Sequence, residues 1–416
     1  MGKLIDDAKQ IVHSAIQTVL PDAAVKRALE NRVFDGKVVV ISIGKAAWSM
    51  ARAAKEILHG HIDTGIVLTK YHHSQGDIDG FTILEAGHPL LDEQSIMSTE
   101  MIIQAVNNLN EEDTVIFLLS GGGSALFEKP AGSLTLEDIL NTTDKLLSCG
   151  ADIVEINTIR KHLSAVKGGR FAQICAPAKV FTIALSDIVG DRIDSIASGP
   201  TCADSSTCDD AKKVIEKYQL DLPAHVHTQI LIETPNKITN SEIMITGSVS
   251  QLCSAAAKIA KSLGYNPLIL STMLDCEARE AGRFLGSIAR TIQKDASPIA
   301  PPCAVICGGE TIVKITGNGL GGRNQEFALA GAETIAGLEN VVLVGVGSDG
   351  TDGPTDAAGG IVDGNTKYRL DGKEISISTI LRENNSNFAL KEVGSLLTTG
   401  PTGTNVNDLY FILIGE

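Results

Sequence analysis

Five residues that follow an apolar run could bind an anion through their backbone. The run 114–119 is typical of a buried strand, and it leads directly into Ser120, Gly121, Gly122, Gly123 and Ser124. Three consecutive glycines let backbone N–H groups converge on a phosphate without side-chain obstruction, whereas a plain turn needs only one. We therefore favour a phosphate-binding loop over a simple reversal of the chain.

A lysine occupies a similar place after an earlier strand. The apolar run 38–43 ends at Gly44 and Lys45, and a helical pattern begins at once. A cation on the first turn of a helix lies beside the positive end of the helix dipole, a position that suits a phosphate or carboxylate. The alternative is an ordinary solvated lysine.

Two aspartates follow a third strand, expected at 179–185. Asp187 and Asp191 could hold Mg²⁺, or one of them could accept a proton from a hydroxyl group. An N-terminal helix cap and a turn residue are equally common uses of aspartate. Both interpretations stay open from the residues alone.

The stretch GNGLGGRNQE, residues 317–326, has the G-x-G-x-x-G spacing of a dinucleotide-binding loop. We expect a strand before it at 311–315 and a helix after it, the context that this fingerprint requires. However, the acidic residue that should bind a ribose about 20 positions later has no clear occupant, because Glu333 lies within the expected helix and Asp349 lies past the next strand. Arg323 also puts a full charge at the helix start, where it is placed to clamp an oxyanion through two hydrogen bonds.

Further carboxylates follow two more strands in the second half of the chain. Glu310 comes after a strand and two glycines, and Asp349, Asp352 and Asp356 lie in a Gly/Pro loop after 341–346. Their spacing does not match the alternate ligands of an EF-hand, so we weigh another metal or hydroxyl site against simple Asx turns. Residues expected to contact substrate or to support those that do are Glu310, Asn324, Asp349 and Asp352.

A basic segment, NTIRKHLSAVKGGR, carries Arg160, Lys161, Lys167 and Arg170. At a spacing of seven, Arg160 and Lys167 would share one face of a helix expected over 152–167. The cluster could attract an anionic ligand, or it could be a solvated basic surface.

The elements that must position these residues alternate between strands and helices, which predicts an α/β fold with a mostly parallel sheet. Two prolines and a polar cluster within 221–241 break the alternation. We therefore predict two α/β domains, an N-terminal one over 1–235 and a C-terminal one over 236–416. Further expected elements are strands at 65–69, 82–84, 242–246, 267–270, 304–307 and 409–414, and helices near 4–20, 46–58, 92–108, 135–148, 248–263, 275–294, 323–336 and 379–393.

Composition narrows the class of protein. The 416 residues carry 35 Lys plus Arg against 50 Asp plus Glu, a formal charge of −15, which disfavours nucleic-acid and anionic-membrane binding. The eight cysteines are scattered without metal spacing, so we expect reduced thiols. The N-terminal stretch lacks a signal-peptide pattern and no apolar run is long enough to span a membrane, so we expect a cytoplasmic protein.

Anion-binding loops, two cations and clustered aspartates are what phosphoryl transfer needs, and the residues alone favour an ATP-dependent small-molecule kinase. Seven motifs in order then resemble the class II glycerate kinases, the glycerate 2-kinase family: SIGKAAWSMA, GHPLLDEQS, LLSGGGSALFEKP, NTIRKHLSAVKGGR, LSDIVGDRIDSIASGPT, GGETIVKITGNGLGGRNQEFAL and SDGTDGPTDAAGG. Residues from about 303 to 412 resemble the MOFRL domain of that family.

The resemblance implies transfer of the ATP γ-phosphoryl group to the 2-hydroxyl of D-glycerate, with a divalent metal such as Mg²⁺. It also implies an active site in the cleft between a Rossmann-like N-terminal domain and a distinct α/β C-terminal domain. Lys45 and Arg323 match the two prominent active-site cations of the family. The segment 120–124 matches its Gly-rich loop, and Asp187 and Asp349 match motif carboxylates. Serine at 348, where threonine is commoner, is the one departure and keeps a hydroxyl.

The resulting hypothesis places the ATP phosphates on the 121–124 loop and Lys45. Asp187, with Asp191 as a second metal ligand, holds Mg²⁺ or accepts the substrate proton, and Arg323 binds the glycerate carboxylate or the γ-phosphoryl group. One alternative is an NAD(P)H-dependent hydroxypyruvate reductase, and another is a catalytically silent nucleotide-binding regulator. The oligomeric state is not predicted.

Overall fold

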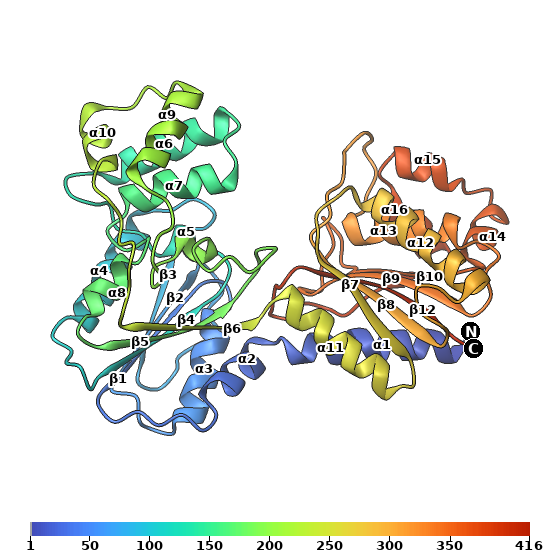
Figure 1. The fold of residues 1–416 in the computed structure, drawn as a ribbon, viewed down its shortest axis with the longest axis horizontal. Helices are drawn as coiled ribbons and strands as arrows, with labels where there is room; N and C mark the ends of the chain where they lie inside the picture. The colour runs from blue at the N-terminus through green and yellow to red at the C-terminus, as the bar shows by residue number, and fades with distance from the viewer. Residues whose placement is uncertain (1) are drawn as a thin grey trace. The chain divides into compact units, whose positions relative to one another are not determined.

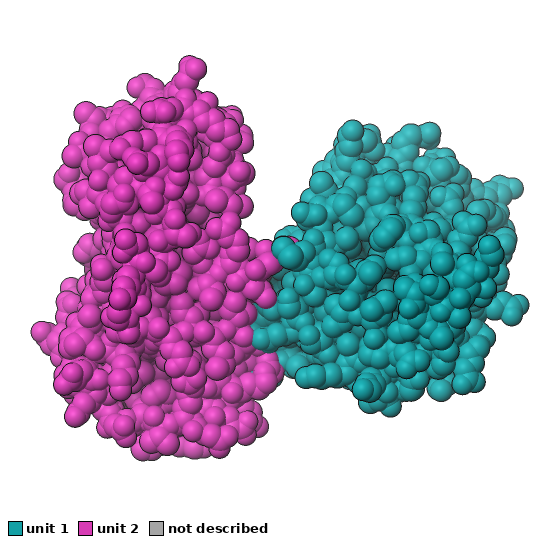
Figure 2. All heavy atoms as spheres, in the orientation of Figure 1, with its two compact units in different colours: residues 1–23, 247–416 teal, residues 24–246 magenta. Residues whose placement is uncertain are grey.

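The computed structural model describes residues 2–416, which form two compact units coloured separately in Figure 2. One unit comprises residues 24–246, and the other comprises residues 2–23 together with 247–416. This division differs from the expected boundary at 235/236 in two respects. The next strand, β6 (Ser241–Gly247), joins the sheet of the first unit, and helix α1 (Gly2–Thr18) packs into the core of the second.

The 24–246 unit contains a six-stranded sheet in the order β3-β2-β1-β4-β5-β6. Strands β1 to β5 pair in parallel, and β1, β4 and nearly all of β5 are buried, as expected for strands covered on both faces. Their carboxyl ends therefore meet at one edge of the sheet. The strand bounds are β1 Val38–Ile43, β2 Thr64–Lys70, β3 Phe81–Ala86, β4 Thr114–Leu119 and β5 Lys179–Leu185.

The helices of this unit fall into two groups. Those with residues in the two cores that cover the sheet are α2 Pro21–Leu29, α3 Ala47–Leu58, α4 Glu93–Val106, α5 Gly123–Leu126 and α8 Arg170–Cys175, with the short 3₁₀ turn η1 Ile196–Ser198. A second group builds a core of its own and stands apart from the sheet in Figure 1. It consists of α6 Leu136–Ser148, α7 Ile153–Leu163, α9 Cys208–Tyr218 and α10 Ala224–Ile230.

The other unit contains a mixed sheet in the order β11-β10-β9-β12-β8-β7. Strand β12 (Asp408–Ile414) lies antiparallel between β8 (Cys303–Gly309) and β9 (Val341–Gly347), while β7 (Asn266–Leu274) pairs with β8 in parallel. The antiparallel pair β10 (Gly359–Asp363) and β11 (Leu396–Leu397) completes the sheet. Helices α1 and α11 (Val249–Ser262) cover one face. The other face carries α12 Ala278–Asp295, α13 Arg323–Thr334, α14 Thr366–Asp371, α15 Ile377–Arg382 and α16 Ser386–Glu392.

The expectation of two α/β units is confirmed, with three local corrections. The strand expected at 311–315 is wrong: those residues make only one isolated bridge, through Ile312. The helix expected at 379–393 is two short helices, because Glu383 to Asn385 leave the helical path to contact the 316–320 loop. The helix expected to reach residue 167 ends at Leu163. None of the helices within residues 2–416 is long and apolar enough to cross a membrane.

Candidate active site

The Gly-rich loop of the 24–246 unit is locked to the turn that carries Lys45. The Ser120 N–H and hydroxyl both donate to the Ile43 carbonyl, at 2.9 and 3.2 Å, and the Ser120 hydroxyl accepts from the Ala46 N–H at 3.1 Å. The Lys45 N–H donates to the Gly121 carbonyl at 2.9 Å. These bonds join the carboxyl ends of β1 and β4. The exposed residue Lys45 therefore lies directly beside the Gly-rich loop.

Two glycines make this arrangement possible. Gly44 has a φ of +118°, and a Cβ there would lie 2.3 Å from the Ser120 hydroxyl. Gly122 has a φ of +90°, and a Cβ there would lie 3.0 Å from the His88 ring. Apart from any bond within α5 itself, the backbone N–H groups of residues 121–124 donate to no other backbone group in the described range 2–416. They are thus available as anion donors, as expected for a phosphate-binding loop.

Asp187, after β5, lies against the same loop. A Cβ on Gly121 would be only 2.3 Å from Asp187 Oδ2, so the carboxylate occupies the space that a side chain would fill. Burial raises the pKa of Asp187, and its own backbone N–H and the charge of Lys45 oppose that rise in part. The structure therefore brings together Lys45, the 120–124 loop and Asp187 at the edge where β1, β4 and β5 end.

His88 also lies here, although no role was predicted for it. Its ring packs against Gly122, and burial lowers its pKa, with further lowering by Lys45, Lys70 and His73. The imidazole is therefore neutral at pH 7 and can donate or accept a hydrogen bond beside the loop. The quoted motif GHPLLDEQS contains this residue, but only the strand order, with β3 two places from β1, could have placed it here.

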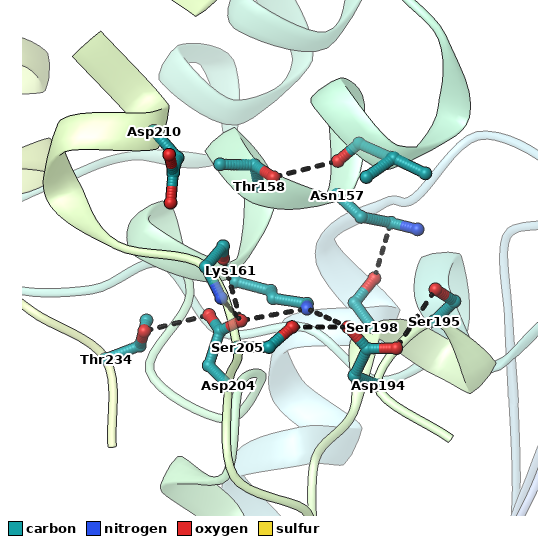
Figure 3. Close-up of polar contacts among 12 residues, drawn as sticks. Asn157, Thr158, Lys161, Asp194, Ser195, Ser198, Asp204, Ser205, Asp210 and Thr234 are labelled. Atoms are coloured by element: carbon teal, nitrogen blue, oxygen red, sulfur yellow. Dashed lines mark hydrogen bonds and ion pairs between the residues drawn. The ribbon is translucent and has the colours of Figure 1, made fainter. Parts of the chain in front are cut away.

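The far end of the loop is tied to α7 by hydroxyl groups. Ser124 and Ser198 share a hydrogen bond of 3.2 Å, and the Ser198 hydroxyl donates to Asn157 Oδ1 at 3.0 Å, as Figure 3 shows for the latter pair. Asp191 lies earlier in the same 186–198 segment with a φ of +51°. Its Oδ1 atom is buried and has no hydrogen-bond partner among residues 2–416. An unpaired buried carboxylate oxygen is costly, and a bound cation would satisfy it.

In the other unit, Arg323 begins α13 and is held by two carboxylates. Its Nε and Nη2 donate to the two oxygens of Asp408, at 2.5 and 3.1 Å, and its Nη1 donates to Glu310 Oε1 at 2.9 Å. Burial acts to lower the pKa of Arg323, but the hydrogen bonds and charge of Asp408, with Glu310, raise it overall. Arg323 is thus paired with carboxylates of its own unit, and a third of its side chain remains exposed.

Asp408 is the central residue of this cluster and was missed from the sequence. It is 1% exposed and starts β12 between the ends of β8 and β9, where it also accepts from the Tyr410 hydroxyl at 2.9 Å. Burial raises its pKa, and the bonds from Arg323 act against that rise. The neighbouring Asn407 donates to Glu310 Oε2 at 2.9 Å. Asp408 and Asn407 together fix the positions of Arg323 and Glu310.

Asp352 caps the N-terminus of α13, the helix that begins at Arg323. Its carboxylate accepts from the backbone N–H groups of Asn324 and Gln325, at 3.0 and 2.8 Å, and from both of their side chains. Burial raises the pKa of Asp352 to about 6 despite these bonds. Asn324 is buried beside it, whereas Asp349 is half-buried and accepts from the Thr351 N–H at 3.0 Å, an Asx turn.

The glycines of GNGLGGRNQE serve close packing. Added Cβ atoms at Gly317 and Gly319 would lie 2.4 Å from the backbone of Glu383 and from Asn385, and one at Gly322 would lie 2.3 Å from Asp352. The loop is therefore packed against its own unit, and no strand leads directly into it, since β8 ends at Gly309. Neither feature fits a dinucleotide-binding turn, whose glycines leave space for a pyrophosphate.

The basic segment is folded into the protein interior. Lys167 is fully buried and donates to Glu128 at 2.5 Å. Lys161 pairs with Asp204 at 3.0 Å and with Asp194 at 3.3 Å, and Figure 3 shows these two ion pairs. Lys167 lies beyond the end of α7, so it does not extend the helix face of Arg160 as expected. Lys161 and Lys167 therefore belong neither to a solvated basic surface nor to a cluster that is free to bind an anion.

The basic segment also includes two arginines, both partly buried. Arg170 donates through Nη1 to the carbonyls of Lys161 and Ser164. Arg160 Nε is buried without a hydrogen-bond partner among the residues described. Arg170 thus holds the backbone at Lys161 and Ser164 in place. The contacts of Arg160 indicate no function for that residue.

Known proteins match this chain over almost its whole length. Residues 7–231 match the family described as a domain of unknown function (DUF4147), and residues 303–408 match the MOFRL family. A D-glycerate 2-kinase from Thermotoga maritima is 53% identical over 98% of this chain and 97% of its own length. A putative hydroxypyruvate reductase from Agrobacterium vitis is 40% identical, over 98% and 94%. The crystal structure of glycerate kinase from Thermotoga maritima superposes with a TM-score of 0.96 at 52% identity and covers 100% of both chains.

Proposed function

The chain belongs to the glycerate 2-kinase family with a C-terminal MOFRL domain, and on that premise we propose that it transfers the γ-phosphoryl group of ATP to the 2-hydroxyl of D-glycerate. The products are 2-phosphoglycerate and ADP. The observation that carries the proposal is the junction of Lys45, the 120–124 loop and Asp187 at one sheet edge. Phosphoryl transfer depends on such positioned charges more than on covalent chemistry.

In this proposal the loop and Lys45 bind the ATP phosphates. The N–H groups of residues 121–124 donate to phosphate oxygens, and the Lys45 ammonium neutralises charge on the β- and γ-phosphates. Ser120 does not touch the nucleotide, because its hydroxyl is used in joining the two turns. Ser120 is therefore a positioning residue.

Asp187 and Asp191 would hold Mg²⁺, which supplies neutralisation of the phosphate charge when bound. Mg²⁺ in kinases commonly uses one or two protein carboxylates together with substrate phosphates, and the unpartnered Asp191 Oδ1 fits that requirement. The raised pKa of Asp187 also suits a group that accepts the proton of the C2 hydroxyl as the phosphoryl group arrives. Which of these two tasks Asp187 performs decides how the rate depends on pH.

Arg323 would bind the glycerate carboxylate or the γ-phosphoryl group. A guanidinium has five N–H donors, of which Asp408 and Glu310 take three. The remaining two, on the partly exposed side of the group, can bond an oxyanion. Asp408 and Asp352 hold the guanidinium and its helix in place for that contact. That the two units act on one bound pair of substrates remains a prediction.

A hydroxypyruvate reductase is the second candidate, because two relatives from Agrobacterium vitis carry the name putative hydroxypyruvate reductase. The packed glycines of the 317–322 loop and the missing strand before it weigh against a nicotinamide cofactor. A silent nucleotide-binding regulator is weakened by the presence of Lys45, Asp187 and Arg323 together. The cytoplasmic location expected from the sequence stays a prediction.

One pair of assays tests the proposal. ADP formation from ATP and D-glycerate is measured beside NADH oxidation with hydroxypyruvate, with and without Mg²⁺. The kinase proposal requires glycerate-dependent ADP formation that EDTA abolishes. NADH turnover without ADP formation would establish the reductase instead.

A further inference from the structure

Three potential metal ligands meet in the helical group of the 24–246 unit, away from the Gly-rich loop. They are His162 at the end of α7, Cys208 at the start of α9 and Glu233 in the segment after α10. One ligand atom from each lies within 4.8 Å of the other two. Among residues 2–416, no other group of three His, Cys, Asp or Glu side chains comes as close together.

His162 is oriented as a metal ligand would be. Its side chain is fully buried, and its Nδ1 lies 2.8 Å from the Thr158 carbonyl, which can only accept a hydrogen bond. Nδ1 therefore carries the proton and Nε2 presents a lone pair. Nε2 is buried and has no hydrogen-bond partner among the residues described. Metal-binding histidines are commonly fixed in this manner, by a hydrogen bond from the other ring nitrogen to a carbonyl.

The other two ligands of the group differ in burial, because Cys208 is buried and Glu233 is exposed. Cys208 is 5% exposed, and its backbone N–H donates to both Glu233 oxygens, at 3.1 and 3.2 Å. Glu233 is exposed, so a cation can reach the cluster from solvent. The adjacent Thr234 donates to Asp204, which also pairs with Lys161, as Figure 3 shows. These bonds hold the start of the segment next to Glu233.

We propose that His162, Cys208 and Glu233 bind a transition-metal cation of the Zn²⁺ class. Nitrogen, sulfur and carboxylate oxygen are the ligands that Zn²⁺ prefers, and three protein ligands leave a fourth position for water. Binding breaks the Cys208 S–H bond, forms a sulfur–metal bond and releases the proton to solvent. The thiolate and Glu233 then balance the charge of the cation. Bonds of about 2.0–2.3 Å require the ligand atoms to draw closer together, a movement that the exposed Glu233 side chain can supply.

The site ties together three segments, α7, α9 and the chain after α10, and contains none of the residues assigned to phosphoryl transfer. Its role is therefore structural, and it is independent of the proposed kinase activity. Occupancy should raise the melting temperature by about 5 °C at a large excess of Zn²⁺ over the dissociation constant. Turnover at saturating substrate should not change.

Co²⁺ provides a direct probe, because a cobalt–thiolate bond gives a charge-transfer band in the near ultraviolet. The full-length protein, stripped with EDTA and reduced, is titrated with CoCl₂ and then with ZnCl₂ as competitor. We expect a band that saturates at one Co²⁺ per chain and is displaced by Zn²⁺. The band should be absent in Cys208→Ser, and Co²⁺ affinity should fall at least 10-fold or so in Glu233→Gln. Cys149→Ser, a partly buried thiol of the same unit outside the cluster, is the matched control and should behave as wild type.

The proposal is overturned if the wild-type protein gives no thiolate band, or if Cys208→Ser retains it. It is also overturned if Glu233→Gln binds Co²⁺ as tightly as Cys149→Ser. Should Cys208→Ser fail to fold, the exposed Glu233→Gln variant and the Zn²⁺-dependent melting shift decide the question.

Discussion

Replacing Gly121 by alanine puts a methyl group where the Asp187 carboxylate now lies. The new Cβ would be 2.3 Å from Asp187 Oδ2, whereas ordinary contact begins at 3.4 Å. Gly121 is not among the glycines with positive φ, so the backbone accepts alanine without strain. The carboxylate must therefore retreat by roughly 1 Å, while the loop keeps its path.

A displacement of about 1 Å in a positioned group can cost about 100-fold in rate, and we expect kcat of Gly121→Ala to fall by that factor. The free energy of unfolding should change by about 1 kcal/mol or less, because one partly exposed side chain moves and no core contact is lost. The assay couples ADP release to NADH oxidation, and thermal unfolding is measured in parallel. Gly372→Ala is the control, since its Cβ would lie at an ordinary 3.4 Å from the Tyr368 carbonyl.

A double variant makes this prediction sharper. If Gly121→Ala acts by moving Asp187, it should cost much less in an Asp187→Ala background, because the clash is then absent. A folded Gly121→Ala protein with wild-type kcat would refute the reasoning. So would an equal loss in both backgrounds, which would assign the effect to the loop itself.

Three further predictions test the cations and their supports. Lys45→Ala should lower kcat/KM by about 100-fold or more in the ADP assay, whereas Lys55→Ala, which loses an exposed ion pair, should stay within about 2-fold. Asp408→Asn removes the buried partner of Arg323 and should lower kcat/KM about 10-fold or more. Asp408→Asn should also lower the free energy of unfolding in urea by about 1–3 kcal/mol, which is less than for a fully buried pair because a third of Arg323 is exposed. Unchanged kcat/KM and unchanged stability would contradict the positioning role of Asp408. Burial raises the pKa of Asp352 to about 6, so the stability that this group contributes is lost as pH rises from about 4 to 6. Asp352→Asn should therefore gain stability relative to wild type over that pH range in urea titrations, and a gap independent of pH would disprove the assignment.

Local sequence patterns were sufficient for strands β1 to β5 of the 24–246 unit, whereas β6 was expected in the other domain. The run 114–119 is apolar throughout and is followed by glycines, so both the buried strand β4 and the turn after it are encoded by adjacent residues. Lys45 and Asp187 could then be placed near that turn, because parallel strands end at a common edge. The positions of these residues follow from strand order alone.

Features that depend on distant contacts were not predictable in the same way. Asp408 looks like the first residue of a strand, and only the antiparallel insertion of β12 between β8 and β9 places it against Arg323. Likewise, the 317–322 glycines have dinucleotide-loop spacing, but their function is to pack against Glu383 and Asn385, more than 60 positions later. Helix α1 was placed in the 1–235 domain because it comes first in the chain, but it packs into the core of the other unit.

Identification of the product tests the central claim most directly. The protein is incubated with ATP, Mg²⁺ and ¹³C-labelled D-glycerate, and the mixture is followed by ³¹P and ¹³C NMR. The proposed function predicts a phosphate ester coupled to C2 of glycerate, formed in equal amount with ADP. A phosphate on C3, or glycerate that stays unmodified while hydroxypyruvate is reduced by NADH, would contradict it.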